Sequence, residues 1–207
     1  MIDFAREILT NKMYSLEKDV NHCLVMPYAP MPAILWCLAC IDFLGALLTG
    51  QASKKIPGTN TNVNTTENSQ IYMISYMDYT QEQAELIQGI FRHKLVHLAQ
   101  PGPLSLYKGK TVVWRYDHDF NPNHLILENF SPPNITKIKP GWQEHVDQRF
   151  MLGINQFVQD IKKSVFKSDG YLDKLKTEAD IREQFRIAIQ DVYAPQEIRN
   201  KVTNSTP

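Results

Sequence analysis

Three residues near the middle of the chain have the types and spacing for acid–base chemistry on a phosphate group. Arg92, His93 and His97 lie in the run Arg-His-Lys-Leu-Val-His. Arginine is always charged and presents a planar fork of N–H donors that fits a phosphate, whereas histidine exchanges a proton near neutral pH. Arg92 and His97 are five residues apart, about 140° around a helix axis, so only the long arginine side chain brings them together. The run indicates a candidate phosphodiester-processing site.

Two other interpretations of these residues stay open. His93 and His97 are four residues apart and share one face of a helix, which is a spacing that metal ligands use. The zinc-protease pattern needs a glutamate after the first histidine, however, and Lys94 stands there and would repel a cation. We therefore expect no metal and no cofactor. The second alternative is an ordinary core helix whose polar residues pair internally or face water.

The candidate residues lie near the end of a predicted amphipathic helix, Thr80 to Leu98. Thr80 is a good N-cap, and Gln83 completes a capping box. Pro101 ends the pattern. The apolar positions recur every three or four residues and form one stripe, which consists of Ala84, Ile87, Phe91, Leu95 and Leu98.

A second helix, Ala33 to Leu48, is predicted to be the buried centre of the fold. Pro32 opens it and Gly50 closes it. The stretch is shorter than the roughly 20 residues of a membrane span and contains Asp42, so we expect no membrane. A carboxylate in such a helix must find a partner or stay protonated. We expect Asp42 to meet Arg92 and to orient the guanidinium beside His97; the alternative is an aspartate facing solvent.

The arrangement of Arg92, the polar His93 and His97 resembles the R-x4–6-H signature of HEPN domains. These domains are small helical bundles, often dimeric; many are metal-independent RNases of toxin–antitoxin, abortive-infection and CRISPR systems, and others are non-catalytic. The resemblance covers residues 1–101. It implies that His97 acts as general acid or base, that Arg92 stabilises charge on the scissile phosphate, and that His93 positions or hydrogen-bonds.

The resemblance also implies the partners of the chain. They are RNA, a second copy of the chain that completes the site in a homodimer, and an antitoxin-like protein. The alternatives are a non-catalytic module of the same fold that binds RNA, a nucleotide or a protein, and a structural domain.

A run of basic residues surrounds the candidate site, although the whole chain has a formal net charge of zero. No Asp or Glu occurs from Leu86 to Tyr116. Such a run fits a phosphate-binding face, and acidic neighbours in space could equally neutralise it. Besides Arg92, its candidate binding residues are Lys94, Lys108, Lys110 and Arg115.

The segment after Pro101 is predicted to form a small antiparallel β-meander. The β-prone runs are 104–107, 111–116 and 124–127, with turn signals between them and one more possible strand at 135–138. Trp114 and Tyr116 could stack on RNA bases. Alternation along this strand more simply predicts one buried and one solvated face.

The remaining segments complete a single α+β domain that is mostly α. We expect a first helix at 2–18, a loop at 51–69, a short helix at 71–79, and two final helices at 144–167 and 177–193. The resulting organisation is a HEPN-like helical part at 1–101, the β-meander at 102–140, the last helices at 141–193, and a polar tail at 194–207.

The three cysteines and the N-terminus favour a cytoplasmic protein. Asp3, Arg6 and Glu7 interrupt any early apolar run, so we expect no signal peptide. An odd number of cysteines argues against a disulfide framework. Cys37 and Cys40 have the C-x-x-C spacing, but they lie inside an apolar helix, so we expect them to be core residues.

Overall fold

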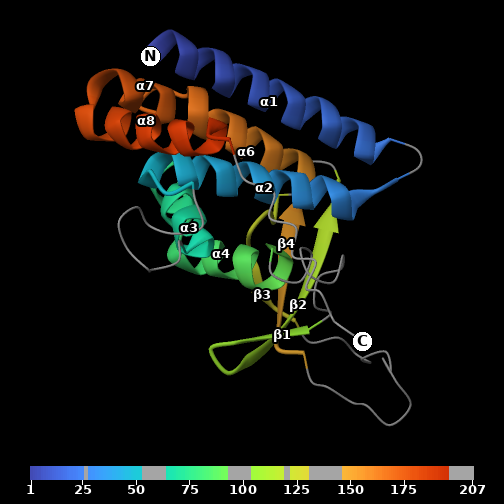
Figure 1. Ribbon diagram of the computed structural model, residues 1–207. Helices are drawn as coiled ribbons and strands as arrows, with labels where there is room; N and C mark the ends of the chain where they lie inside the picture. Colours follow the sequence, from blue (N-terminus) through green and yellow to red (C-terminus); the bar gives the residue numbers. More distant parts are fainter. Residues whose placement is uncertain (26–27, 53–63, 93–103, 119–121, 131–145, 196–207) are drawn as a thin grey trace, which may run out of the picture.

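The structure is a computed structural model that describes residues 1–25, 28–52, 64–92, 104–118, 122–130 and 146–195 (Figure 1). The helices are α1 (Ile2–Leu24), α2 (Pro30–Thr49), α3 (Thr65–Tyr76), α4 (Gln81–Leu86), the π-helical η1 (Ile87–Arg92), α6 (Ile154–Phe166), α7 (Tyr171–Thr177) and α8 (Ala179–Tyr193). The strands are β1 (Leu104–Tyr107), β2 (Lys110–Asp117), β3 (Leu127–Asn129) and β4 (Gln148–Gly153). The predicted class, α+β and mostly α, is confirmed.

Helix α2 is the centre of the bundle, as predicted. It packs against α1, α6 and α8 on one side and against α3 and η1 on the other (Figure 1). Among the described residues it is the one helix long and apolar enough to cross a membrane, and half of its most apolar window is buried inside the protein. The fully buried positions in α2 include Ile34, Cys37, Ile41 and Leu44. This burial is what a core helix of a bundle shows.

A glycine allows α3 to pack closely on α2. A Cβ atom built at Gly45 would lie 2.6 Å from the carbonyl oxygen of Asn68, closer than real Cβ contacts allow. Helix α2 then ends at Gly50, whose φ of 71° is left-handed and whose N–H donates to the Ala46 carbonyl. These two glycines fix where α3 crosses α2 and where α2 stops.

The sheet is mixed, which corrects the prediction of a purely antiparallel meander. Its strand order is β1-β2-β4-β3. The β1–β2 hairpin turns at Lys108 and Gly109, both with positive φ, and β3 pairs antiparallel with β4. Strand β2, in contrast, pairs parallel with β4, with Trp114 opposite Phe150. Such parallel pairing joins segments far apart in the chain, which a local sequence pattern does not reveal.

Strand β4 lies in a segment that was predicted to be helical, residues 144–167. The helix α6 begins only at Ile154. The spacing of Val146, Phe150 and Ile154 fits a helix, but Phe150 to Gly153 is a continuous buried run held between β2 and β3. The predicted helix was therefore wrong at Gln148–Gly153, because a fully buried strand has no alternating pattern.

Three further boundaries on the N-terminal side differ from the prediction. Helix α1 continues to Leu24 instead of ending at residue 18, and α2 starts at Pro30. Helix α3 begins at Thr65, inside the predicted loop 51–69. Its first turns bury the polar Asn68 and Ser69, so the hydrophobic pattern starts after the helix does.

The C-terminal part also differs in detail. Strand β3 lies at Leu127–Asn129, and not at 124–127. The short helix α7 was not predicted, and it ends at Thr177, where the last helix was expected to start. Three helices therefore follow the sheet. The predicted strand at 135–138 and the tail from 196 lie outside the described residues.

Candidate functional site

Arg92 is the last described residue of a helical segment that starts as predicted at Gln81 and becomes π-helical from Ile87. The Thr80 side chain accepts the Gln83 N–H at 3.2 Å, and the Gln83 side chain accepts the Thr80 N–H at 2.9 Å. This capping box starts α4. From Ile87 to Arg92 the backbone is π-helical. The π-helix is rare in proteins, and where it occurs it is often found at functional sites.

The Arg92 guanidinium is bonded to the Asp42 carboxylate, as the sequence predicted. Its Nε lies 2.9 Å from Oδ2 and 3.3 Å from Oδ1 of Asp42. The two side chains are 20% and 25% exposed, so the pair lies at the edge of the core and stays in contact with solvent. The alternative of a solvent-facing aspartate without a partner is excluded.

Helix α3 supplies the other contacts of this ion pair. Arg92 Nη2 donates to Thr65 Oγ1 at 2.8 Å, and Nη1 donates to Thr66 Oγ1 at 3.4 Å. Ser69 Oγ is hydrogen-bonded to Asp42 Oδ1. Asn64 is the N-cap of α3, and its side chain accepts the Glu67 N–H. Because Thr65 and Thr66 follow the cap directly, the start of α3 determines their position beside Arg92. Three elements, α2, α3 and η1, therefore converge on one guanidinium.

Arg92 has more N–H donors than it has partners among the described residues. A guanidinium has five N–H groups, one on Nε and two on each terminal nitrogen. Asp42, Thr65 and Thr66 engage one group on each of the three nitrogens. One N–H on Nη1 and one on Nη2 thus have no partner among the described residues. A charged, partly exposed fork held in one position can bind an anion.

The other residues of the predicted catalytic set lie outside the described residues. They are His93, Lys94 and His97. Their convergence with Arg92, and the metal alternative for the two histidines, stay predictions. Among the residues that the structure describes, no group of three His, Cys, Asp or Glu side chains is arranged to hold a metal ion.

The three basic residues on the β-hairpin, Lys108, Lys110 and Arg115, differ in their surroundings. Lys108 lies 3.4 Å from Glu82 and over the ring of Tyr107, whose hydrogen bond raises the pKa of Lys108. An acidic neighbour therefore neutralises this lysine. Lys110 and Arg115 are exposed and have no ion pair to any described residue.

The aromatic residues of β2 pack inward. Trp114 lies 5.5 Å from Phe91 of η1 and is stacked on Tyr116, ring centre to ring centre 5.9 Å. Both are half-buried against the core. The expectation of one buried and one solvated face is confirmed. Because neighbouring residues alternate, Arg115 projects from the face opposite Trp114, away from η1.

A second polar cluster joins elements that sequence reasoning did not connect. Tyr79 OH donates to Asp160 Oδ2 at 2.9 Å, and His124 Nε2 lies 3.4 Å from the same oxygen. The Gly153 N–H donates to His124 Nδ1 at 2.9 Å, so the neutral ring carries its proton on Nε2, toward Asp160. No local pattern in the sequence pointed to this cluster, since its members are far apart.

The bonds within this cluster fit a structural role better than a catalytic one. Burial raises the pKa of Asp160, but hydrogen bonds from His124, Gln156 and Tyr79 outweigh it and leave that pKa below its usual value. The His124 side chain is 9% exposed, and both of its nitrogens are engaged. It has no free lone pair for a substrate proton.

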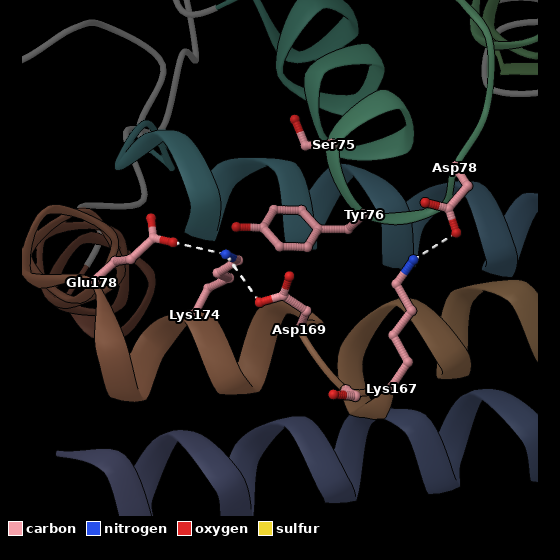
Figure 2. Close-up of a pocket in the computed structure, with 8 residues that line it drawn as sticks. Ser75, Tyr76, Asp78, Lys167, Asp169, Lys174 and Glu178 are labelled. Atoms are coloured by element: carbon pink, nitrogen blue, oxygen red, sulfur yellow. Dashed lines mark hydrogen bonds and ion pairs between the residues drawn. The ribbon is translucent and has the colours of Figure 1, made fainter.

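A polar groove of about 360 Å³ lies between the end of α3 and the α6–α7–α8 turns (Figure 2). Lys167 binds Asp78 at 2.6 Å, and Lys174 binds both Asp169 and Glu178, at 3.1 Å and 3.0 Å. Burial raises the pKa of Tyr76, on the groove wall, to about 12. Both ammonium groups are neutralised, so this groove has no charge left for a phosphate.

The cysteines are core residues, as predicted. Cys37 and Cys40 are fully buried in α2, and burial raises the pKa of both thiols, that of Cys40 to about 12. Thiols in this state are poor nucleophiles and poor metal ligands. The two thiols of the C-x-x-C spacing are free and lie inside the core of the bundle.

Comparisons with protein-family models, with curated proteins and with solved structures found no match to this chain.

Proposed function

We propose that the chain is a HEPN-like, metal-independent endoribonuclease in which Arg92 contacts the scissile phosphate. The observation that carries this proposal is the bond from Arg92 Nε to Asp42. A mobile arginine loses side-chain entropy when it binds a substrate. An arginine that a carboxylate and two threonines already hold loses less, because it is positioned before the substrate binds. The resemblance of Arg92, His93 and His97 to the HEPN signature supplies the reaction class.

The chemistry assigned to the site needs one proton carrier and one fixed charge. In the proposal, His97 takes the proton from a ribose 2′-hydroxyl or gives one to the leaving 5′-oxygen. The 2′-oxygen forms a bond to phosphorus as the bond to the 5′-oxygen breaks, which leaves a cyclic phosphate end. Arg92 balances the charge on the phosphoryl oxygens, and His93 positions the substrate.

The same proposal includes the setting of the site. A homodimer would complete it, with RNA as substrate and an antitoxin-like protein as regulator. A prokaryotic defence or toxin system in the cytoplasm would be its context. Lys94 beside the motif, with Lys110 and Arg115 on the hairpin, would hold more distant phosphates.

A second candidate function is a non-catalytic module that binds RNA or a nucleotide. The observation that favours it is the number of internal bonds on Arg92. All three guanidinium nitrogens already donate within the chain. An arginine used in this way contributes to the fold whether or not a reaction follows.

Cleavage of RNA in EDTA separates the two functions. Wild type is compared with Arg92→Ala and His97→Ala, and with the controls Arg6→Ala and His22→Ala, which alter exposed residues of α1. We expect wild type and both controls to cleave and to leave cyclic phosphate ends, and the two site variants to lose at least about 100-fold in rate. No cleavage by folded wild type, or equal cleavage by all five proteins, would contradict the nuclease.

A further inference from the structure

A second groove, of about 440 Å³, lies beside Arg92 and carries a different chemistry from the first. One face of α3 forms its wall, because Glu67, Gln70, Ile71 and Ile74 follow each other at helical spacing. Gln81, from the start of α4, also lines it. Unlike the groove between α3 and α7, it has no lysine or arginine among the described residues that line it.

Thr66 joins this groove to the candidate phosphate site. Its side chain lines the groove, and its Oγ1 accepts the N–H of Arg92 Nη1 at 3.4 Å. A phosphate on the open donors of Arg92 would therefore lie at the mouth of the groove. The groove itself would then receive whatever is attached to that phosphate.

Two isoleucines in the wall of the groove suit a flat, apolar face. Ile71 and Ile74 are each 39% exposed, so part of each aliphatic side chain is open to a ligand. Stacking of a nucleobase on aliphatic side chains would cover this surface. A second helix from a partner would need a longer apolar stripe than these two residues provide.

The rim of the groove selects among bases by its hydrogen-bonding groups. One oxygen of Glu67 accepts from Asn64 Nδ2 at 3.2 Å, and the other has no partner among the described residues. The Gln70 amide, likewise, has no hydrogen bond within the described part of the chain. A carboxylate only accepts hydrogen bonds, so it favours a base edge with adjacent N–H donors.

Guanine has the edge that fits these groups. Its N1–H and N2–H donors are adjacent, so one can bond to the open oxygen of Glu67 and the other to the oxygen that also accepts from Asn64, while its O6 accepts from an amide such as that of Gln70. Adenine, cytosine and uracil each present at least one acceptor where the carboxylate would need a donor. A charge-assisted pair of bonds at this edge would discriminate strongly.

We propose that the groove between α3 and α4 is a guanine subsite, with Glu67 as the residue that determines base specificity. The inference rests on the proposed function, because the phosphate held by Arg92 is what directs the base to the groove. It names the nucleotide that the nuclease or binding module prefers.

Equilibrium binding of the four nucleoside monophosphates, as 3′ and 5′ isomers, tests the subsite in the full-length protein. We expect one GMP isomer to bind at least about tenfold more tightly than the matching AMP, CMP and UMP. Glu67→Gln should remove that preference and leave the other three unchanged. Arg92→Ala should weaken all four alike, and the control Glu7→Gln, on an exposed face of α1, should change none.

The outcomes separate the subsite from the nuclease. Equal binding of the four monophosphates, no binding of any, or a GMP preference that survives Glu67→Gln would overturn the guanine subsite. RNA cleavage without preference for a guanine next to the cut would do the same and leave the nuclease intact. GMP preference that depends on Glu67, together with no cleavage of any RNA, would keep the subsite and refute the nuclease.

Discussion

Arg92 Nε lies 2.9 Å from Asp42 Oδ2, and this bond ties the last residue of η1 to the middle of α2. The Asp42 carboxylate also accepts a hydrogen bond from the Ser69 hydroxyl of α3. One aspartate in the most apolar helix of the chain thus connects three elements. Its position explains why an apolar core helix tolerates a charge at this point.

Replacing Asp42 with Asn should destabilise the protein. The variant keeps the size of the side chain but removes the charge that holds the guanidinium, so we expect a loss of about 1–3 kcal/mol in the free energy of unfolding. Urea denaturation measures it. Asp3→Asn, at a side chain that is 97% exposed, is the matched control and should stay within about 0.5 kcal/mol of wild type. Equal effects of the two changes would contradict a structural role for the ion pair.

The sequence was informative wherever a signal is local. The capping box of Thr80 and Gln83 could be predicted because its two bonds join residues three apart. The pairing of Asp42 with Arg92 could be proposed because a carboxylate in an apolar helix needs a partner or must stay protonated, and Arg92 lies in the other central helix of the predicted bundle.

The sequence failed where the structure depends on distant partners. Phe150 to Gly153 forms a strand because β2 and β3 flank it, and nothing within the segment distinguishes it from a buried helix. The Tyr79, His124 and Asp160 cluster depends on the same sheet-to-helix junction. The groove residue Glu67 was assigned to the loop 51–69 because α3 begins with polar, partly buried turns.

Gly45 should not tolerate even the smallest side chain. The methyl group of Gly45→Ala would meet the Asn68 carbonyl oxygen at 2.6 Å, and backbone atoms cannot move aside as a flexible side chain can. We expect a loss of about 1–3 kcal/mol in thermal or urea unfolding. Gly89→Ala is the control, because nothing lies within 4 Å of the added atom, and it should be neutral or stabilising by up to about 1 kcal/mol. A neutral Gly45→Ala would show that α3 does not pack on α2 at this distance.

The fall in the free energy of unfolding at acid pH should depend on Asp160. Burial raises the pKa of this carboxyl, but hydrogen bonds from His124, Gln156 and Tyr79 lower it below the ordinary 3.8. The stability that follows from a lowered pKa is present above the unfolded value and is lost as pH falls through the folded one. Asp160→Asn should therefore be about 1–3 kcal/mol less stable than wild type at neutral pH, and the difference should shrink below about pH 4.

Urea denaturation at a series of pH values measures this dependence. Asp19→Asn, an exposed change on α1, should run parallel to wild type at every pH. A gap between wild type and Asp160→Asn that stays constant down to acid pH would mean that the carboxylate charge does not stabilise the fold.

Two buried tyrosines that face each other should respond in opposite directions when the hydroxyl is removed. Tyr72 and Tyr171 are both fully buried, with ring centres 5.8 Å apart. Ser164 Oγ donates to the Ile161 carbonyl at 2.7 Å, so in its 2.9 Å contact with Tyr72 the tyrosine is the donor. The Tyr171 hydroxyl, in contrast, has no hydrogen-bond partner in the described part of the chain.

Removing the bonded hydroxyl costs a hydrogen bond, whereas removing the unbonded one relieves a desolvated polar group. We expect Tyr72→Phe to lose about 1 kcal/mol of stability and Tyr171→Phe to gain about 1 kcal/mol, since a buried hydroxyl without a partner is unfavourable by that order. Thermal unfolding of both variants beside wild type measures the two shifts. The two substitutions delete the same atom from the same residue type in one cluster, so each controls for the other. A loss of stability in Tyr171→Phe as large as in Tyr72→Phe would mean that the Tyr171 hydroxyl has a bonded partner in the folded protein.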